Sequence, residues 1–281
     1  MSATPGTLRR PHLRPTGRAR RISGRALARV ALSLLGGLSF LGLWAALAKW
    51  KFEPIVLPSP FAVVENMWDL LQEGVVGEAF FKSLYKTLMG WGGAVALGIP
   101  IGLLMGRYRY ARAFFHDLVY LLANVPLVVY AVISLVVFGI SDIGPAFVVM
   151  LLVLPAVAIN VAAGVASADE GLISMSRAFR RRGSQVARFV IVPAVLPFLL
   201  AAARVSFADS WKLEALTETF GSASGVGFQI HKAFTSFSVL DALSWMMFFV
   251  IFVVVVERVL LAPAERRIFA WRNPGAARDS L

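Results

Sequence analysis

The chain has 281 residues, of which 58% are hydrophobic and 16% are charged, and its formal net charge is +12. This composition excludes a soluble globular protein, because too few polar residues remain to cover a water-exposed surface. Cysteine is absent, and the three histidines (His12, His116 and His231) lie far apart in the sequence, with no H-E-x-x-H or G-x-x-x-x-G-K-[ST] motif. We therefore expect no catalytic residue, no metal site and no bound cofactor in this chain.

Six apolar segments are long enough to cross a membrane as helices. About 20 mostly apolar residues are needed, because lipid offers no hydrogen-bond partners to the backbone. The sequence therefore predicts an all-α polytopic membrane protein with about six transmembrane helices. The predicted spans are Val30–Ala48, Thr87–Gly106, Leu118–Ile140, Ile143–Ala166, Phe189–Ala208 and Ala242–Leu261.

The positively charged residues lie on alternate connections between the predicted spans. Arginines crowd the tail before the first span and follow the second, fourth and sixth spans, whereas the opposite connections carry acids that include Asp142, Glu214 and Glu218. Basic loops stay on the cytoplasmic side, so both termini are predicted to be cytoplasmic. This alternation also argues against a nucleic-acid-binding role for the excess arginine.

The same reasoning gives three regions. Residues 1–29 form a basic tail that we expect to be disordered, and its charge either sets topology or also contacts anionic lipid. Residues 30–262 form the transmembrane domain, and residues 263–281 form a cytoplasmic C-terminal tail. A cleaved signal peptide is the alternative reading of the first span, but its removal would invert the charge pattern of the remaining chain.

A short helix is predicted after Leu57-Pro58-Ser59-Pro60. Ser59 suits the N-cap position and Pro60 suits the first helical position. Four large apolar side chains then recur at helical spacing, which predicts either an amphipathic helix on the outer membrane surface or a buried packing stripe. These side chains are Phe61, Val64, Trp68 and Leu71.

The second span carries small residues at every fourth position, at Gly90, Ala94, Gly98, Gly102 and Gly106. Small residues at this spacing let another helix approach closely. Because a bundle of about six helices buries most helix faces internally, we expect this face to pack within the subunit rather than across a dimer.

The third and fourth spans contain a proline and several polar groups. Pro126 predicts a bend, which is either a gate or a distortion accommodated by neighbouring helices. Asn124 and Asn160 are candidate pathway residues, and bonding between helices explains them equally well.

The loop after the fourth span resembles the E-A-A loop of permease subunits in bacterial ABC importers. It reads from Asp169 to Pro197 as D-E-G-L-I-S-M-S-R-A-F-R-R-R-G-S-Q-V-A-R-F-V-I-V-P-A-V-L-P. The L-P-S-P start, Phe138-Gly139-Ile140 and the basic, aromatic exit after the sixth span are similar to the nitrate, sulfonate, taurine and bicarbonate branch of these permeases. The resemblance extends over about Leu57 to Arg272.

The resemblance implies a type I ABC importer permease fold in the bacterial cytoplasmic membrane. It also implies partners: ATPase subunits that bind ATP and Mg, a second permease, either a copy of this chain or a distinct one, and an extracytoplasmic substrate-binding protein. A coupling loop over about residues 167–188 would dock on the ATPase. The alternative is a solvated basic loop without a docking role.

The loop departs from the family pattern. In the gapless register Ser174, Met175 and Ser176 occupy the Glu-Ala-Ala positions and Arg180 occupies the glycine, whereas aligning Gly183 instead requires a deletion. The lost acid and glycine suggest a heterodimer with a second permease that keeps both. The ATPase-coupling candidates are Ser174, Met175, Ser176, Arg177, Ala178, Phe179, Arg180, Arg181 and Arg182.

The segment after the fifth span has the tryptophan, glutamate and glycine that the resemblance associates with an outer or re-entrant segment near the pore. Charges at such a site are costly and therefore suggest function. A structural pair between Lys212 and Glu214 or Glu218 is the alternative, and a buried bond network is the alternative for Arg204 and Asp209. The pathway candidates here are Arg204, Asp209, Trp211, Lys212, Glu214 and Glu218.

We conclude from the sequence that the chain forms the translocation pathway of an ATP-driven importer for a small organic or inorganic anion. A stand-alone secondary carrier and a membrane-embedded enzyme are the alternatives. Transport driven by protons without ATP would favour the carrier, and activity that depends on one acid without any partner would favour the enzyme.

Overall fold

A computed structural model describes residues 22–261 and residue 263, and within these residues every regular element is helical. The predicted tails are residues 1–29 and 263–281; of these, residues 1–21 and 264–281 lie outside the described part, whereas residues 22–29 belong to helix α1. The elements are α1 (Ile22–Trp50), α2 (Pro60–Gln72), α3 (Val75–Arg107), α4 (Arg109–Asn124), α5 (Leu127–Phe138), α6 (Ile143–Ala166), α7 (Glu170–Ala178), α8 (Gly183–Val186), η1 (Ala187–Ile191), α9 (Val192–Gly221), α10 (Val226–Thr235), α11 (Val239–Val255) and η2 (Val256–Leu261).

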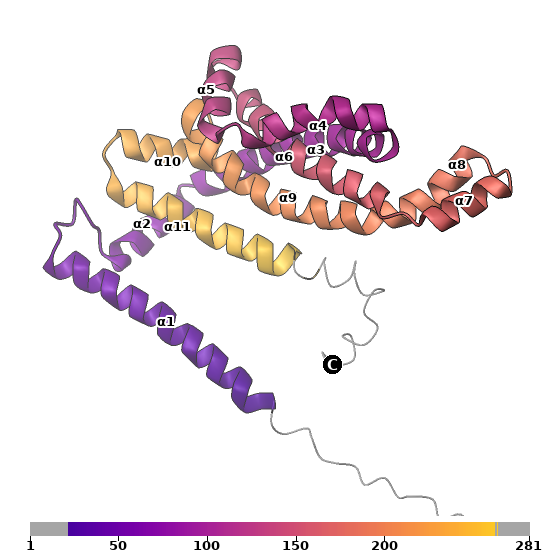
Figure 1. The fold of residues 1–281 in the computed structure, drawn as a ribbon. Coiled ribbons are helices and arrows are strands. Elements are labelled where there is room, and N and C mark those ends of the chain that lie inside the picture. The colour runs from indigo at the N-terminus through magenta and orange to yellow at the C-terminus, as the bar shows by residue number, and fades with distance from the viewer. Residues whose placement is uncertain (1–21, 262, 264–281) are drawn as a thin grey trace, which may run out of the picture.

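Four helical segments in the described part are long and apolar enough to span a membrane: Val75–Arg107, Ile143–Ala166, Gly183–Gly221 and Val239–Val259. Helices α4 and α5 become a fifth span if the bent pair is counted as one. Helix α1 lies apart from the bundle (Figure 1), and the indole nitrogen of Trp44 joins it to the carbonyl of Pro58 at 3.0 Å. The predicted all-helical membrane fold is therefore confirmed.

Helices α3, α6 and α9 form the centre of the bundle, and the small residues of α3 explain how closely it packs. A side chain added at Gly102 would lie 2.5 Å from the carbonyl oxygen of Ala158 and 2.7 Å from Val161. Gly90, Gly98 and Gly106 meet α6 in the same way. The ladder packs within the subunit, as predicted.

The third predicted span is broken. Helices α4 and α5 meet at an angle of 95°, where the sequence predicted one bent span over Leu118–Ile140. Val125 has an extended backbone because the ring of Pro126 disfavours helical geometry at the preceding residue. Helix α5 therefore runs in a new direction (Figure 1), while Tyr130, Ala131 and Ser134 keep one of its faces buried.

Helix α2 begins as predicted, with the hydroxyl of Ser59 accepting a hydrogen bond from Ala62 and Pro60 in the first position. Asn66 ties this helix to α11 through Asp241 (2.9 Å) and Ser244 (3.0 Å). The four large apolar side chains of the predicted stripe are exposed, so the buried-stripe alternative is wrong for the described chain. The stripe instead faces outward, as expected of an amphipathic surface helix.

Candidate functional site

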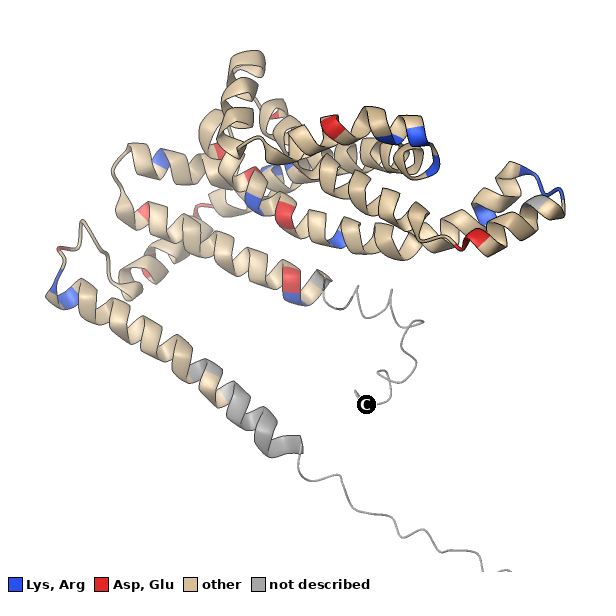
Figure 2. Cartoon of the chain, in the orientation of Figure 1, with Lys and Arg blue, Asp and Glu red and all other residues tan. Residues whose placement is uncertain are grey.

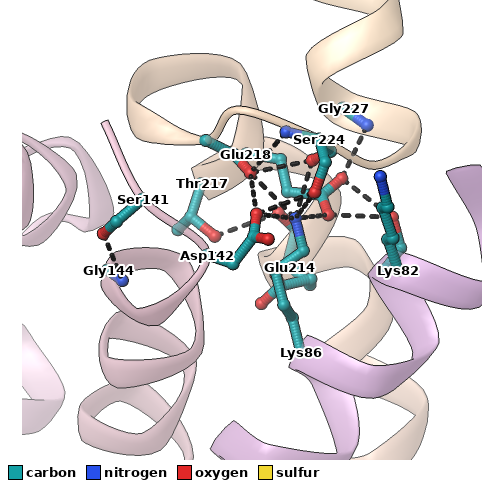
Figure 3. A network of polar contacts seen from close by, with 12 residues as sticks. Lys82, Lys86, Ser141, Asp142, Gly144, Glu214, Thr217, Glu218, Ser224 and Gly227 are labelled. Atoms are coloured by element: carbon teal, nitrogen blue, oxygen red, sulfur yellow. Dashed lines mark hydrogen bonds and ion pairs between the residues drawn. The ribbon is translucent and has the colours of Figure 1, made fainter.

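A buried lysine in the first half of α3 and a buried glutamate of α9 join two spans. The ammonium of Lys86 lies 2.7 Å from Oε1 of Glu218 in α9, and both side chains are at most 1% exposed. Lys86 also donates to the hydroxyl of Ser222 at 2.8 Å and to the carbonyl of Ser224 at 2.6 Å. Figure 3 shows these groups converging from α3 and from the end of α9. The lysine is therefore fully surrounded by acceptors.

The loop between α9 and α10 closes over the carboxylate of Glu218. The backbone nitrogen of Gly227 donates to its Oε2 at 2.7 Å, and the hydroxyl of Ser83 donates to Oε1 at 2.8 Å. Ser83 also accepts a hydrogen bond from the backbone nitrogen of Val226. Gly225 has a φ of 104°, and a side chain there would collide with Glu218. Glycine is thus required both by conformation and by space.

Asp142 connects the α5–α6 junction to the same cluster. One carboxylate oxygen accepts from Ser224 at 2.7 Å and lies 3.3 Å from the ammonium of Lys86. Partial burial opposes its ionisation, but the hydrogen bond from Ser224 and the charge of Lys86 outweigh that effect and hold the pKa of Asp142 below its ordinary value. The cluster therefore ties three segments of the chain together by charge.

Glu214 lies one turn before Glu218 on α9 and is fully buried. Neither of its carboxylate oxygens has a hydrogen-bond partner in the described part of the chain, and the same holds for the buried Trp211 Nε1 and Thr87 Oγ1. A buried polar group without a partner costs free energy, so these groups are poised to accept a partner that the described chain does not supply. The carboxylate of Glu214 needs hydrogen-bond donors, whereas the indole N–H of Trp211 needs an acceptor.

The structure separates the predicted pathway residues. Trp211, Glu214 and Glu218 are buried within α9, which continues as one helix to Gly221 where the sequence predicted an outer or re-entrant segment. Lys212 is exposed and pairs with Asp209 at 3.4 Å and Glu257 at 3.8 Å. The alternative in which Lys212 pairs with Glu214 or Glu218 is therefore wrong, since successive residues of a helix point in different directions.

The remaining pathway candidates lie elsewhere. Asn124 and Asn160 each donate to a carbonyl four residues earlier in their own helix, Tyr120 and Ala156 respectively, so these two hydrogen bonds do not join helices. Arg204 is half-buried in α9 and has an interaction partner. None of these three belongs to the Lys86 cluster.

Sequence reasoning missed Lys86 and the role of Asp142. The predicted second span began at Thr87, one residue after the lysine, whereas α3 begins at Val75. A lysine bordered by apolar turns is itself a signal, because a charge within a span needs a partner. That signal predicts an acid nearby but cannot say which acid.

The predicted coupling loop forms a helical hairpin. Asp169 begins it by accepting a hydrogen bond from Gly171 at 2.7 Å, α7 holds the positions from Ser174 to Ala178, and a turn over residues 179–182 leads to α8. Arg180 in this turn has a φ of 52°, the left-handed conformation that favours glycine. This is the residue that the gapless register places at the glycine.

The hairpin projects from the bundle, at the end where α3 ends and α4 begins (Figure 1). Its tip exposes two large apolar side chains, with Phe179 72% and Met175 51% exposed. Basic residues of the hairpin and of the α3–α4 turn lie at the same end of the molecule (Figure 2). The hairpin thus has a regular helical structure, and it exposes apolar and basic side chains at its tip.

Comparison with known proteins gives a consistent result. Residues 98–262 match the family described as the binding-protein-dependent transport system inner membrane component. A probable ABC transporter permease protein of Brucella abortus (strain 2308) is 30% identical over 219 residues, which cover 78% of this chain and 87% of the relative. The taurine transport system permease protein TauC of Escherichia coli (strain K12) is 25% identical, with coverage of 68% and 71%.

The nitrate import permease protein NrtB of Synechocystis is 22% identical and covers 75% of this chain and 82% of its own length. Among solved structures, an inward-facing form of the MetNI methionine ABC transporter has a TM-score of 0.57 at 21% identity, covering 69% of this chain and 94% of that chain. This likeness shows a shared fold.

Proposed function

The chain belongs to the family of binding-protein-dependent transport system inner membrane components, and from this premise we propose that it forms the translocation pathway of an ATP-driven importer. The family consists of transport permeases, which are not enzymes. In this proposal the chain performs no chemistry, and two permease subunits alternate between outward-facing and inward-facing states.

The observation that carries the proposal is the α7–α8 hairpin. Its exposed Phe179 and Met175 would enter a groove of an ATPase subunit, and burial of such side chains is the main source of free energy in protein association. Arg181 and Arg182 beside them would face acidic side chains. ATP and Mg would be bound by that ATPase, whose closure would push the hairpin and with it the α9 span that follows.

A further part of the proposal concerns whether the two permease subunits are identical. Ser174 provides no charge, and Arg180 holds a turn that glycine would hold at lower cost. We propose that the second permease is a distinct chain with the acid and the glycine in place, so that the two ATPase contacts are unequal. A complex that contains only two copies of this chain would overturn this part of the proposal.

The solute is proposed from the names of two relatives, a taurine transport permease and a nitrate import permease. We propose a small organic or inorganic anion that an extracytoplasmic binding protein delivers to the outer face. A cationic side chain such as Lys86 near that face is compatible with an anion pathway, although it is now fully engaged by its acceptors.

Affinity purification tests the assembly. The full chain would be tagged at its C-terminus, extracted mildly from native membranes, and analysed by mass spectrometry for its partners and their ratios. We expect an ATPase subunit, and a second permease if the heterodimer is correct. Recovery of the chain alone in repeated mild extractions would overturn the importer and favour a carrier.

A matched pair of variants identifies the contact. Phe179→Asp places a charge on the tip of the hairpin and should abolish recovery of the ATPase. Phe237→Asp makes the same change at an 88% exposed position in the loop between α10 and α11, and should leave recovery unchanged. Equal recovery with both variants would contradict docking through the hairpin.

A further inference from the structure

A pocket lies at the cytoplasmic end of the bundle, far along α3 from the Lys86 cluster. Its volume is about 600 Å³, and it is enclosed by the α3–α4 turn, the end of α6, and the α7–α8 hairpin. Three spans border it, because α3 ends at Arg107, α6 ends at Ala166 and the next span begins at Gly183. The pocket therefore lies at the boundary between the bilayer and the cytoplasm.

The charged residues that line this pocket are mostly basic, among apolar neighbours. Arg107, Arg112 and Arg181 contribute to it, and Glu170 is the one acid among the lining residues. None of these four forms an ion pair with another residue in the described part of the chain. The pocket thus has an excess of two positive charges that the described fold does not neutralise.

Two of the arginines are held by contacts that leave donors available. Arg112 uses Nε to donate to the carbonyl of Met105 at 3.1 Å, which leaves its terminal nitrogens for another acceptor. The guanidinium of Arg107 lies over the ring of Tyr108, 5.5 Å from the centroid. Ser174 adds a hydroxyl to the same lining. The side chains of Arg107 and Arg112 are therefore held in place, and their guanidinium groups still have hydrogen-bond donors available for a ligand.

We propose that this pocket binds a phosphate-bearing anion. Guanidinium groups match the geometry of phosphate oxygens through paired hydrogen bonds, and three arginines that line one space favour a multiply charged ligand over a chloride ion. Basic pockets between spans on the cytoplasmic side are suited to the headgroups of anionic lipids. The ligand is either such a headgroup or a soluble phosphate, and both present the same oxygens to the arginines.

Because of where the pocket lies, a ligand bound in it would affect how the hairpin is connected to the bundle. Its walls include the hairpin on one side and the ends of α3 and α6 on the other. A bound dianion would link the hairpin to the bundle by charge, so its occupancy would stiffen the connection through which an ATPase moves the spans. An acidic side chain of the ATPase is the competing occupant.

The test uses the full chain, with the subunits that co-extract, in phosphatidylcholine nanodiscs with and without phosphatidylglycerol. Native mass spectrometry would count retained phosphatidylglycerol, and calorimetry in the phosphatidylcholine discs would measure binding of inorganic phosphate. The variants are Arg107→Gln with Arg181→Gln, and the single Arg181→Gln in case the double variant unfolds. Arg109→Gln, an exposed arginine in the same turn that does not line the pocket, is the control.

We expect binding to weaken about fivefold for each pocket arginine removed and to be unchanged by Arg109→Gln. Retained lipid without phosphate binding identifies a headgroup, and phosphate binding without lipid identifies a soluble ligand. Absence of both in the unmodified protein, or equal losses in the Arg109 variant, would overturn the proposal.

Discussion

The ammonium nitrogen of Lys86 lies 2.7 Å from Oε1 of Glu218, and this ion pair is almost completely removed from solvent. It joins α3 to α9, while hydrogen bonds from Gly227 and Ser83 engage the same carboxylate. Such a pair costs desolvation free energy when it forms, so its value lies less in net stability than in fixing how the two spans meet. Through the hydrogen bond from Gly227, the carboxylate of Glu218 also holds the start of α10 against the bundle.

Replacing Lys86 by methionine should destabilise the protein severely. The change leaves Glu218 buried without its cation, and removing one partner of a buried pair typically costs about 3–5 kcal/mol. Lys82→Met is the control, because Lys82 pairs with Glu78 at the surface, where solvent screens the ion pair and its loss should change the unfolding temperature little. Thermal unfolding of the extracted protein measures both changes. Similar effects of the two variants would show that the Lys86 pair is not buried in the folded protein.

The ladder of α3 predicts a contrast between two glycines. Gly102→Ala would force a methyl group against Ala158 and Val161, and overpacking of this kind costs about 1–3 kcal/mol. Gly92→Ala meets nothing within 4 Å and should stabilise α3 by up to about 1 kcal/mol through helix propensity. The unfolding temperature should therefore fall for the first variant and rise or stay unchanged for the second. The opposite order would refute close packing of α3 on α6.

Local sequence signals predicted the features that depend on local chemistry. The cap at Ser59 and the small face of α3 both follow from the side chains present and from helical geometry, and both are found. The partner of Lys86 could not be predicted in this way. Glu218 lies 132 positions later (218 minus 86), and only the packing of α3 against α9 brings the two together.

The breaks and ends of helices were harder to predict. The hydropathy of Leu118–Ile140 predicted one continuous span, because apolar residues continue on both sides of Pro126. Hydropathy measures how apolar a segment is and does not report a change in the direction of the helix axis. The charged and polar residues after Ala208 suggested the end of a span, yet α9 continues to Gly221 because Glu214 and Glu218 are buried by neighbouring helices. Tertiary contacts thus override composition at both places.

The turn of the hairpin gives a third prediction. Arg180 holds a left-handed conformation with a φ of 52°, which costs an L-residue other than glycine about 1 kcal/mol. Arg180→Gly should therefore stabilise the turn, and Arg182→Gly, at a φ of −61°, should loosen it by about 0.5–1 kcal/mol. Hydrogen exchange of the α7 and α8 amides reports the difference. Faster exchange in the Arg180 variant than in the Arg182 variant would contradict the conformation of the turn.

The lowered pKa of Asp142 predicts how its contribution depends on pH. Burial opposes ionisation, but Ser224 and Lys86 favour the carboxylate more strongly, so the folded protein holds the proton less tightly than the unfolded chain. A depressed pKa stabilises the fold above the ordinary value of 3.8, and this stability is lost as the pH falls through the lower folded value. The benefit of Asp142 should therefore be present at neutral pH and absent in strong acid.

Asp142→Asn isolates this contribution, because the amide keeps the size of the side chain and has no charge for Lys86. The unfolding temperature of the variant should lie below that of the unmodified protein at pH 6, and the gap should shrink as the pH is lowered below about 4. Ser224→Ala should narrow the gap at pH 6, since it removes the hydrogen bond that favours the carboxylate. A gap that stays constant across this range would mean that Asp142 acts through its shape, and that its charge does not hold the α5–α6 junction to Lys86.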